Sequence, residues 1–144
     1  MEFSNQKAER YSSLAVRYSI DIIYFWFGIL KPLGLSPAED LVTTTLFFLP
    51  PQAALYLIGA WELMIGVLML HRKTVKYSLA LLFLHLPGIL SPIVFMPELI
   101  FQNFPHSLTL EGQYVFKNLI ITGAALKLAT EQVDFEKLTG KLEQ

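Results

Sequence analysis

Five polar residues lie inside or at the ends of strongly apolar stretches, where their side chains could do chemistry. They are Lys31, Glu62, His85, Lys117 and Asn118. Glu62 is the clearest case, because the other twelve residues of the run Ile58–Leu70 all suit a lipid bilayer. A charge at the centre of a membrane helix costs roughly 2.5–3.5 kcal/mol on insertion scales, so such residues usually face other helices or water. These side chains could form an internal ion pair, bind a polar ligand or carry a proton.

The spacing of small residues predicts the direction in which Glu62 points. Gly59, Glu62 and Gly66 are separated by three and four residues, which places them on one face of a helix. Small residues beside the acid let a neighbouring helix approach closely. Glu62 is therefore predicted to point into a helix bundle.

A polar stripe on the first apolar segment has the same helical spacing. It consists of Arg17, Asp21, Tyr24, Gly28 and Lys31. Arg17 and Asp21 are spaced to form an ion pair. Lys31 is near the outer end of its segment, where it either reaches water or bends inward. Lys31 and four residues of the other apolar segments form a predicted polar seam, which opens toward the outer half of the bundle. The other four are Glu62, His85, Lys117 and Asn118.

Three interpretations of this seam stay open from the sequence. In the structural one, Glu62 pairs with Lys31 or Lys117, and His85 hydrogen-bonds a carbonyl that a proline frees in its helix. In the second the seam binds a ligand or a redox partner, and in the third it conducts protons or ions. Metal or haem binding is not predicted, because His85 is the only histidine in the middle of an apolar segment.

The elements that position these residues are predicted to be membrane-spanning helices. The chain is 53% hydrophobic and 16% charged, whereas soluble domains carry about 25% charged residues. Four apolar segments approach the roughly 20 residues that cross a hydrocarbon core. We therefore expect an all-α fold, a polytopic membrane four-helix bundle, with residues 1–144 forming a single membrane domain. The predicted spans are residues 14–31, 53–70, 75–96 and 113–129.

Two outer connections carry helix-start signals. Ser36 and Glu39 match the capping-box pattern, which predicts a short outer helix over residues 37–48. We interpret it as an interfacial helix over the bundle, with a mobile lid over a ligand pocket as the alternative. In the second outer loop, Thr109 can cap the last helix, with Glu111 in its first turn.

The basic residues predict the orientation in the membrane. Lysine and arginine cluster around the start of the first segment, between the second and third, and at or after the end of the fourth. Four spans place all three clusters on one side, and an excess of basic residues marks the cytoplasmic side. Both termini are therefore predicted to be cytoplasmic, in a cell (inner) membrane.

Charge and composition argue against several classes of function. The net charge of −1 gives no electrostatic support for nucleic-acid binding. The lack of cysteine excludes disulfide scaffolds and thiol catalysis. No HExxH, GxGxxG, P-loop or GxSxG pattern is present, so the residues predict no catalytic set and no enzyme acting on its own.

Three stretches of the chain resemble the DoxX-like family of small four-helix membrane proteins. In the first segment, an aromatic-rich stretch leads to the pattern G-x-x-K at Gly28 to Lys31. The second segment contains G-x-x-E-x-x-x-G-x-x-L, with Met69 in place of the final leucine. Residues 111–118, EGQYVFKN, are similar to the pattern E-G-x-Y-x-x-K-N of one subgroup. The resemblance extends over roughly Ala15–Leu128.

The resemblance implies a role beside other membrane proteins. Members of the broad group are similar to subunits of a thiosulfate:quinone oxidoreductase, to components of membrane oxidoreductase complexes and to assembly proteins. We therefore expect an accessory subunit or assembly factor of a membrane complex, such as a respiratory or redox-stress complex. Its partners would be the lipid bilayer and other membrane subunits or a second copy of the chain. A quinone-binding oxidoreductase component is one alternative, and a small proton-coupled transporter is another.

Overall fold

The protein is mostly helical, with about 77% of its residues in helices. The structure, a computed structural model, describes the backbone of residues 2–142 and the side chains of residues 7–132. Within this part of the chain, the long helices are α1 (Glu2–Leu30), α3 (Pro51–Leu70), α4 (Val75–Leu90) and α8 (Asn118–Leu142). The shorter elements are α2 (Glu39–Thr45), α5 (Pro92–Phe95), α6 (Pro97–Ile100), β1 (Phe101–Asn103), β2 (Ser107–Leu108) and α7 (Leu110–Phe116).

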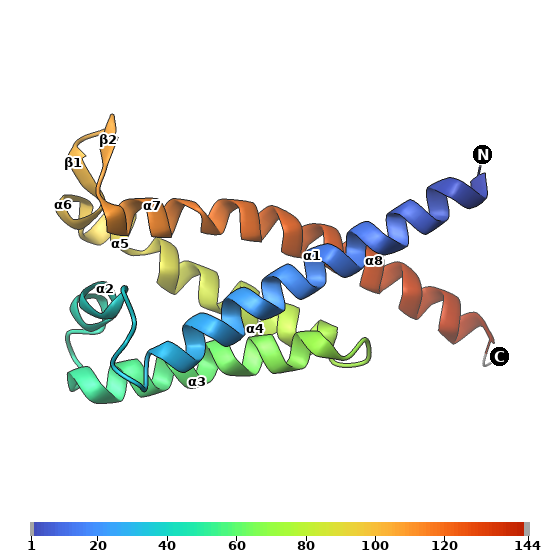
Figure 1. Ribbon diagram of the computed structural model, residues 1–144, viewed down its shortest axis with the longest axis horizontal. Helices are drawn as coiled ribbons and strands as arrows, with labels where there is room; N and C mark the ends of the chain where they lie inside the picture. Colours follow the sequence, from blue (N-terminus) through green and yellow to red (C-terminus); the bar gives the residue numbers. More distant parts are fainter. Residues whose placement is uncertain (1, 143–144) are drawn as a thin grey trace.

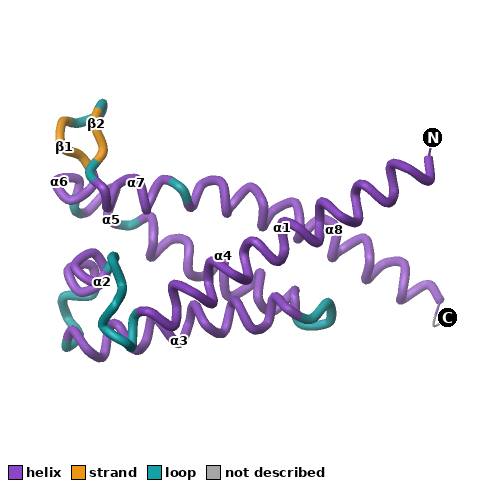
Figure 2. Tube along the Cα trace, in the orientation of Figure 1, coloured by secondary structure: helices purple, strands orange, loops and turns teal. Residues whose placement is uncertain are grey.

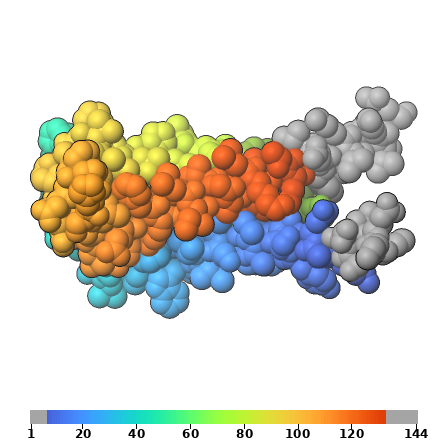
Figure 3. Space-filling view, turned by 90° about the horizontal axis from the view of Figure 1, so that it is seen from above, coloured from blue at the N-terminus to red at the C-terminus, as the bar shows by residue number. Residues whose placement is uncertain are grey.

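The long helices lie side by side with their connections at opposite ends (Figure 1). Helix α1 packs mainly along α3, α3 packs on α4, and α4 packs on α8. Seen from above, the orange-red chain of α7 and α8 runs between the yellow-green α4 and the blue α1 (Figure 3). The described ends of α1 and α8 lie at the same end as the loop between α3 and α4 (Figure 1). Helix α2 and the β1–β2 hairpin lie at the other end.

Among the described residues, three helical stretches are long and apolar enough to cross a membrane. They are Lys7–Leu30, Pro51–Leu70 and Val75–Phe95. This supports the prediction of a multi-pass membrane protein. The fourth predicted span, residues 113–129, is divided between α7 and α8 by a turn at Lys117, visible as a short teal segment in Figure 2. Its crossing of the membrane stays a prediction.

Several helices begin or end at other residues than predicted. The first helix was expected over 14–31 but starts at Glu2, since no proline or glycine interrupts residues 2–13. The second starts at Pro51 rather than at residue 53, because proline suits the first turn of a helix. The third, expected over 75–96, is broken at Ser91 between α4 and α5.

Prolines explain the break in the third helix. Pro87 lies inside α4 and Pro92 begins α5, and a proline removes one helical N–H donor and clashes with the preceding turn. The carbonyl of Gly88, freed by Pro92, accepts a hydrogen bond from the hydroxyl of Ser91 at 2.8 Å. The side chain thus satisfies a backbone acceptor that the broken helix leaves free.

The prediction of the outer helix over residues 37–48 was wrong in its bounds and in its cap. Helix α2 covers only Glu39–Thr45, and its N-cap residue is Ala38, without a side-chain capping bond. The hydroxyl of Ser36 instead accepts from the N–H of Ala38 at 3.3 Å. Serine forms such turns with the backbone two residues ahead, so Ser36 closes a turn before the helix begins.

The second outer connection contains a small hairpin that the sequence pattern did not predict. Strands β1 and β2 pair antiparallel between α6 and α7. The predicted cap at Thr109 is confirmed: its side chain accepts from the N–H of Gly112 at 2.9 Å, and Glu111 lies in the first turn of α7. The Thr109 hydroxyl also donates to the carbonyl of Leu99 at 2.5 Å, which ties α7 to α6.

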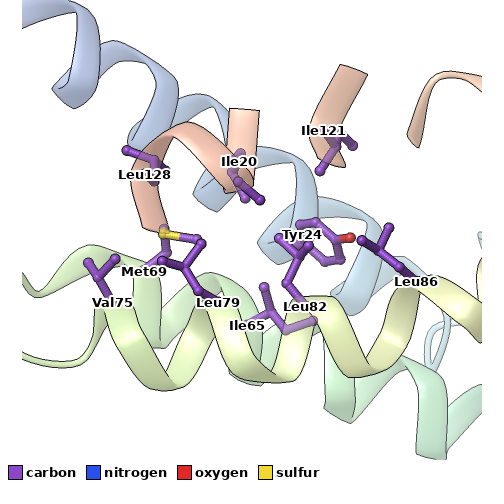
Figure 4. Close-up of a cluster of buried hydrophobic side chains, with 11 residues drawn as sticks. Ile20, Tyr24, Ile65, Met69, Val75, Leu79, Leu82, Leu86, Ile121 and Leu128 are labelled. Atoms are coloured by element: carbon purple, nitrogen blue, oxygen red, sulfur yellow. The ribbon is translucent and has the colours of Figure 1, made fainter. Parts of the chain in front are cut away.

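An apolar core lies between the long helices, on the side of the α3–α4 loop. Figure 4 shows ten labelled side chains of this cluster, which come from α1, α3, α4 and α8. Two hydrogen bonds join α3 and α4 beside it: Ser78 donates to the carbonyl of Ile65 at 2.6 Å, and Trp61 donates to that of Leu81 at 3.2 Å. These bonds hold the register of the two helices.

Three glycines allow the backbones of α1 and α3 to approach closely. A Cβ atom added at Gly28 would lie 2.7 Å from the backbone nitrogen of Leu63. One added at Gly59 would lie 2.8 Å from the carbonyl oxygen of Gly28, and one at Gly66 would lie 2.9 Å from the backbone nitrogen of Phe25. The predicted close-packing face of the second apolar segment is confirmed, and the helix that packs on it is α1.

Candidate functional site

Lys31 and Glu62 form a buried ion pair between α1 and α3. The Nζ atom of Lys31 donates to Oε2 of Glu62 at 2.5 Å, and the two side chains are only 4% and 12% exposed. The close approach of the two helices at Gly28 and Gly59 brings them together. Of the two predicted partners for Glu62, Lys31 is the one that forms the ion pair. Lys31 bends inward rather than reaching water.

His85 extends from α4 toward the other oxygen of Glu62. Its Nε2 atom lies 3.6 Å from Oε1 of Glu62 and, among the described residues, has no hydrogen-bond partner. The imidazole ring stacks on Trp61, with centroids 6.2 Å apart, and meets the edge of Tyr24 at 6.3 Å. The structural interpretation expected His85 to bond a carbonyl freed by a proline, but Nε2 makes no such bond with a described residue, and the freed carbonyl of Gly88 accepts from Ser91.

Lys117 occupies the turn between α7 and α8 and lies outside the ion pair. Its Nζ atom is 4.3 Å from the ring centroid of Tyr114 and 4.6 Å from that of Phe27. The second contact links the last helix to α1. The ammonium group is thus held by two aromatic faces, an arrangement stabilised by the ring quadrupoles.

Asn118 satisfies the backbone beside the same turn. Its side-chain nitrogen donates to the carbonyls of Tyr114 at 2.9 Å and Val115 at 3.3 Å. These carbonyls belong to α7, which ends at Phe116. The amide therefore stabilises the turn that presents Lys117.

The polar stripe on α1 contributes one residue that the sequence pattern did not place in the site. Tyr24 is 4% exposed, and in the described part of the chain its buried hydroxyl has no hydrogen-bond partner. The sequence feature that could have placed Tyr24 at the site is its position on the same helix face as Lys31. In Figure 4 the hydroxyl oxygen of Tyr24 lies on the side of the ring that faces Leu86 of α4.

The end of the stripe that contains Arg17 is arranged differently from the prediction. Arg17 was expected to pair with Asp21, but its guanidinium donates to the carbonyl of Leu70 at 3.2 Å. That carbonyl ends α3, where helical carbonyls lack partners and a cation is favourable. Because the chain brings the end of α3 beside α1, Arg17 caps a neighbouring helix.

A cavity of about 170 Å³ lies among these side chains. All five residues of the predicted polar seam line it, as does Tyr24. The rest of its wall is mostly apolar and comes from all four long helices, α7 and α2. The cavity is far larger than the roughly 10–15 Å³ that one water molecule needs.

Helix α2 contributes part of the wall of this cavity. Its residues Leu41 and Val42, with the adjoining Leu46, line the wall and are half-buried. Apolar side chains of the outer helix therefore face the site. In the described residues, no group of three histidine, aspartate or glutamate side chains lies close enough to hold a metal ion.

Fold and site together define a helical membrane protein with a mostly apolar cavity between its long helices, into whose wall a few polar side chains are set. Comparisons of the chain with protein-family models, with curated proteins and with solved structures found no match.

Proposed function

We propose that this chain is a DoxX-like membrane protein in which all four long helices cross the bilayer and both termini are cytoplasmic. The ends of α1 and α8 share one end of the molecule with the α3–α4 loop, where Arg72 and Lys73 lie. This arrangement supports a single basic side. Helices α7 and α8 together supply the fourth crossing in this proposal, with Lys117 near its outer end.

The proposed role is that of an accessory subunit or assembly factor in a membrane complex, possessing a binding site for the headgroup of a lipid-soluble molecule. The observation that carries this proposal is that Lys31, Glu62, His85 and the adjacent Lys117 and Asn118 meet around one cavity from four separate parts of the chain. An ion pair that served only to fix helix register would not require a cavity beside it. The unpartnered atoms of Tyr24 and His85 further support a polar ligand.

The size and chemistry of the cavity suit a small ring with hydrogen-bond acceptors. An engineered cavity of about 150 Å³ in another protein holds benzene, so 170 Å³ accommodates one six-membered ring. The Tyr24 hydroxyl and the Lys117 ammonium are donors. A quinone headgroup, with two carbonyl acceptors on such a ring, is the neutral candidate for this cavity, and a redox complex would be its corresponding partner.

Native mass spectrometry of the protein extracted in mild detergent tests both parts of the proposal. We expect a bound small-molecule mass on the chain and, at the mildest extraction, additional protein subunits. His85→Phe keeps an aromatic ring against Trp61 while removing the ring nitrogens, so it should retain folded protein and lower the ligand occupancy.

A matched substitution outside the cavity serves as the control. Tyr77→Phe changes an exposed aromatic residue of α4 and should leave the bound mass unchanged. A bare chain, with neither ligand nor partner under the mildest conditions, would overturn the proposal. Equal ligand occupancy in His85→Phe and wild type would show that the ring nitrogens of His85 do not contribute to ligand binding.

A further inference from the structure

The charges around the cavity do not balance. Lys31 and Glu62 neutralise each other at 2.5 Å, and His85 approaches the same carboxylate. Lys117 also lines the cavity, but among the described side chains no carboxylate forms an ion pair with it. One ammonium group thus faces this mostly apolar space without an anion.

The contacts of Lys117 hold its position but do not neutralise its charge. The rings of Phe27 and Tyr114 lie 4.6 and 4.3 Å away, and aromatic faces attract a cation only through their quadrupoles. Lys117 is partly buried, and charged groups taken out of water are normally paired or hydrogen-bonded. Lys31 is on the same wall and repels Lys117, whereas Glu62 attracts it. A negatively charged group in the cavity would complete the balance.

Other groups on the wall offer hydrogen bonds to the same kind of headgroup. The hydroxyl of Tyr24 and Nε2 of His85 are buried and make no hydrogen bond in the described structure, although Nε2 lies 3.6 Å from Oε1 of Glu62. Both side chains are more than nine-tenths buried. Tyrosine hydroxyl donates, and so does Nε2 of histidine when it carries the ring proton. A carboxylate or phosphodiester accepts from every one of these donors.

We propose that the ligand of this cavity is an amphiphile with a singly negative headgroup, a carboxylate or a phosphodiester, held by Lys117. Apolar side chains of the wall, including Leu41 and Leu46, contact the carbons of its chain next to the headgroup. This inference rests on the proposed ligand-binding function and specifies the ligand's charge. Lys117 is the residue that distinguishes the anion from a neutral headgroup of similar size.

Binding of matched probes to the full chain in neutral detergent tests the charge preference. Oleate and methyl oleate have the same chain and differ in the negative charge. Oleate is expected to bind saturably and at least tenfold more tightly than methyl oleate. Lys117→Gln should abolish that preference, and Lys117→Arg should retain most of it. Lys127→Gln, at an exposed lysine paired with Glu131, should bind oleate as wild type does.

Phospholipid probes distinguish the source of the anion. Phosphatidylglycerol is negatively charged and phosphatidylcholine is not. If phosphatidylglycerol binds more tightly than both phosphatidylcholine and oleate, the ligand is a membrane lipid. If oleate binds more tightly than phosphatidylglycerol, the ligand is a free fatty acid. Both outcomes require loss of the preference in Lys117→Gln.

The proposal on charge can fail while the proposed function stands. Methyl oleate or a neutral short-chain quinone could instead bind tightly, and equally well to wild type and Lys117→Gln. That result would show that the ligand is not an anion, while the cavity would still be a ligand-binding site. Binding of no probe, together with no native ligand mass, would overturn both. If Lys117→Gln does not fold, the comparison of oleate with methyl oleate on the wild-type chain decides the question, with Lys117→Arg as the second variant.

Discussion

The ammonium group of Lys31 contacts the carboxylate of Glu62 at 2.5 Å across the interface of α1 and α3. The two residues are separated by 31 positions in the chain and meet because glycines on both helices let the backbones approach. His85 and the cavity lie beside this pair. The same interface therefore sets the packing of two helices and the polar wall of the site.

Removing one partner of this ion pair is expected to destabilise the fold strongly. Lys31→Met or Glu62→Leu leaves a buried charge unpaired, which costs about 3–5 kcal/mol in buried pairs. The double variant removes both charges and should lose less stability than either single variant. Unfolding of each variant in detergent micelles measures these differences as a double-mutant cycle.

The exposed pair of Lys127 and Glu131 provides the control for this cycle. Their side chains are 52% and 36% exposed at a separation of 2.6 Å, and exposed pairs contribute about 0–1 kcal/mol. Lys127→Met and Glu131→Leu should therefore change stability little. Similar losses in both cycles would show that burial does not govern the Lys31–Glu62 interaction.

The close packing of α1 on α3 should depend on Gly59. The methyl group introduced by Gly59→Ala would lie 2.8 Å from the carbonyl oxygen of Gly28, so the helices must separate, and overpacking costs about 1–3 kcal/mol. At Gly123 of α8 no atom lies within 4 Å of an added Cβ. Gly123→Ala should be neutral or stabilising by about 0.5–1 kcal/mol, because glycine disfavours helix. Equal unfolding temperatures for the two variants would contradict the close approach.

The cap of α7 is expected to contribute measurably to stability. Thr109→Ala removes the acceptor for the N–H of Gly112 and the donor to the carbonyl of Leu99, and loss of an N-cap costs about 1 kcal/mol. Thr130→Ala removes only a hydroxyl that donates to a carbonyl of its own exposed helix. Denaturation of the two variants should differ by about 1 kcal/mol, since only Thr109 is a cap. No difference would mean that the hairpin and α6 hold α7 without this side chain.

Because the chain contains no cysteine, single cysteines can report the topology of the proposed four spans. Gln102→Cys in the hairpin should react with a membrane-impermeant thiol reagent in intact cells. Lys73→Cys in the α3–α4 loop and Thr130→Cys in α8 should react only after the membrane is opened. Reaction of Thr130→Cys in intact cells, with Lys73→Cys still protected, would show that residues 110–129 do not cross the membrane.

Helical periodicity accounts for the part of the candidate site that could be predicted from the sequence. Residues three and four positions apart share a helix face, so spacing alone reveals the stripe that contains Tyr24 and Lys31 and the face that contains Glu62. It does not reveal the unpartnered atoms of Tyr24 and His85, because a hydrogen-bond partner depends on atoms from other helices. The hairpin after α6 was not predicted, since its strands of three and two residues are too short to show alternation.

Local features of the sequence were sufficient to predict a helical, multi-pass membrane protein whose acidic residue in the second apolar segment points inward. Length, apolar composition and the spacing of small residues are properties of short stretches of chain. The folded arrangement was needed to show that Lys31 pairs with Glu62, that Lys117 lies at the cavity beside two aromatic rings, and that α2 forms part of the cavity wall. These relationships depend on which helices are neighbours and on how closely their backbones approach, and both are set by packing between segments far apart in the chain.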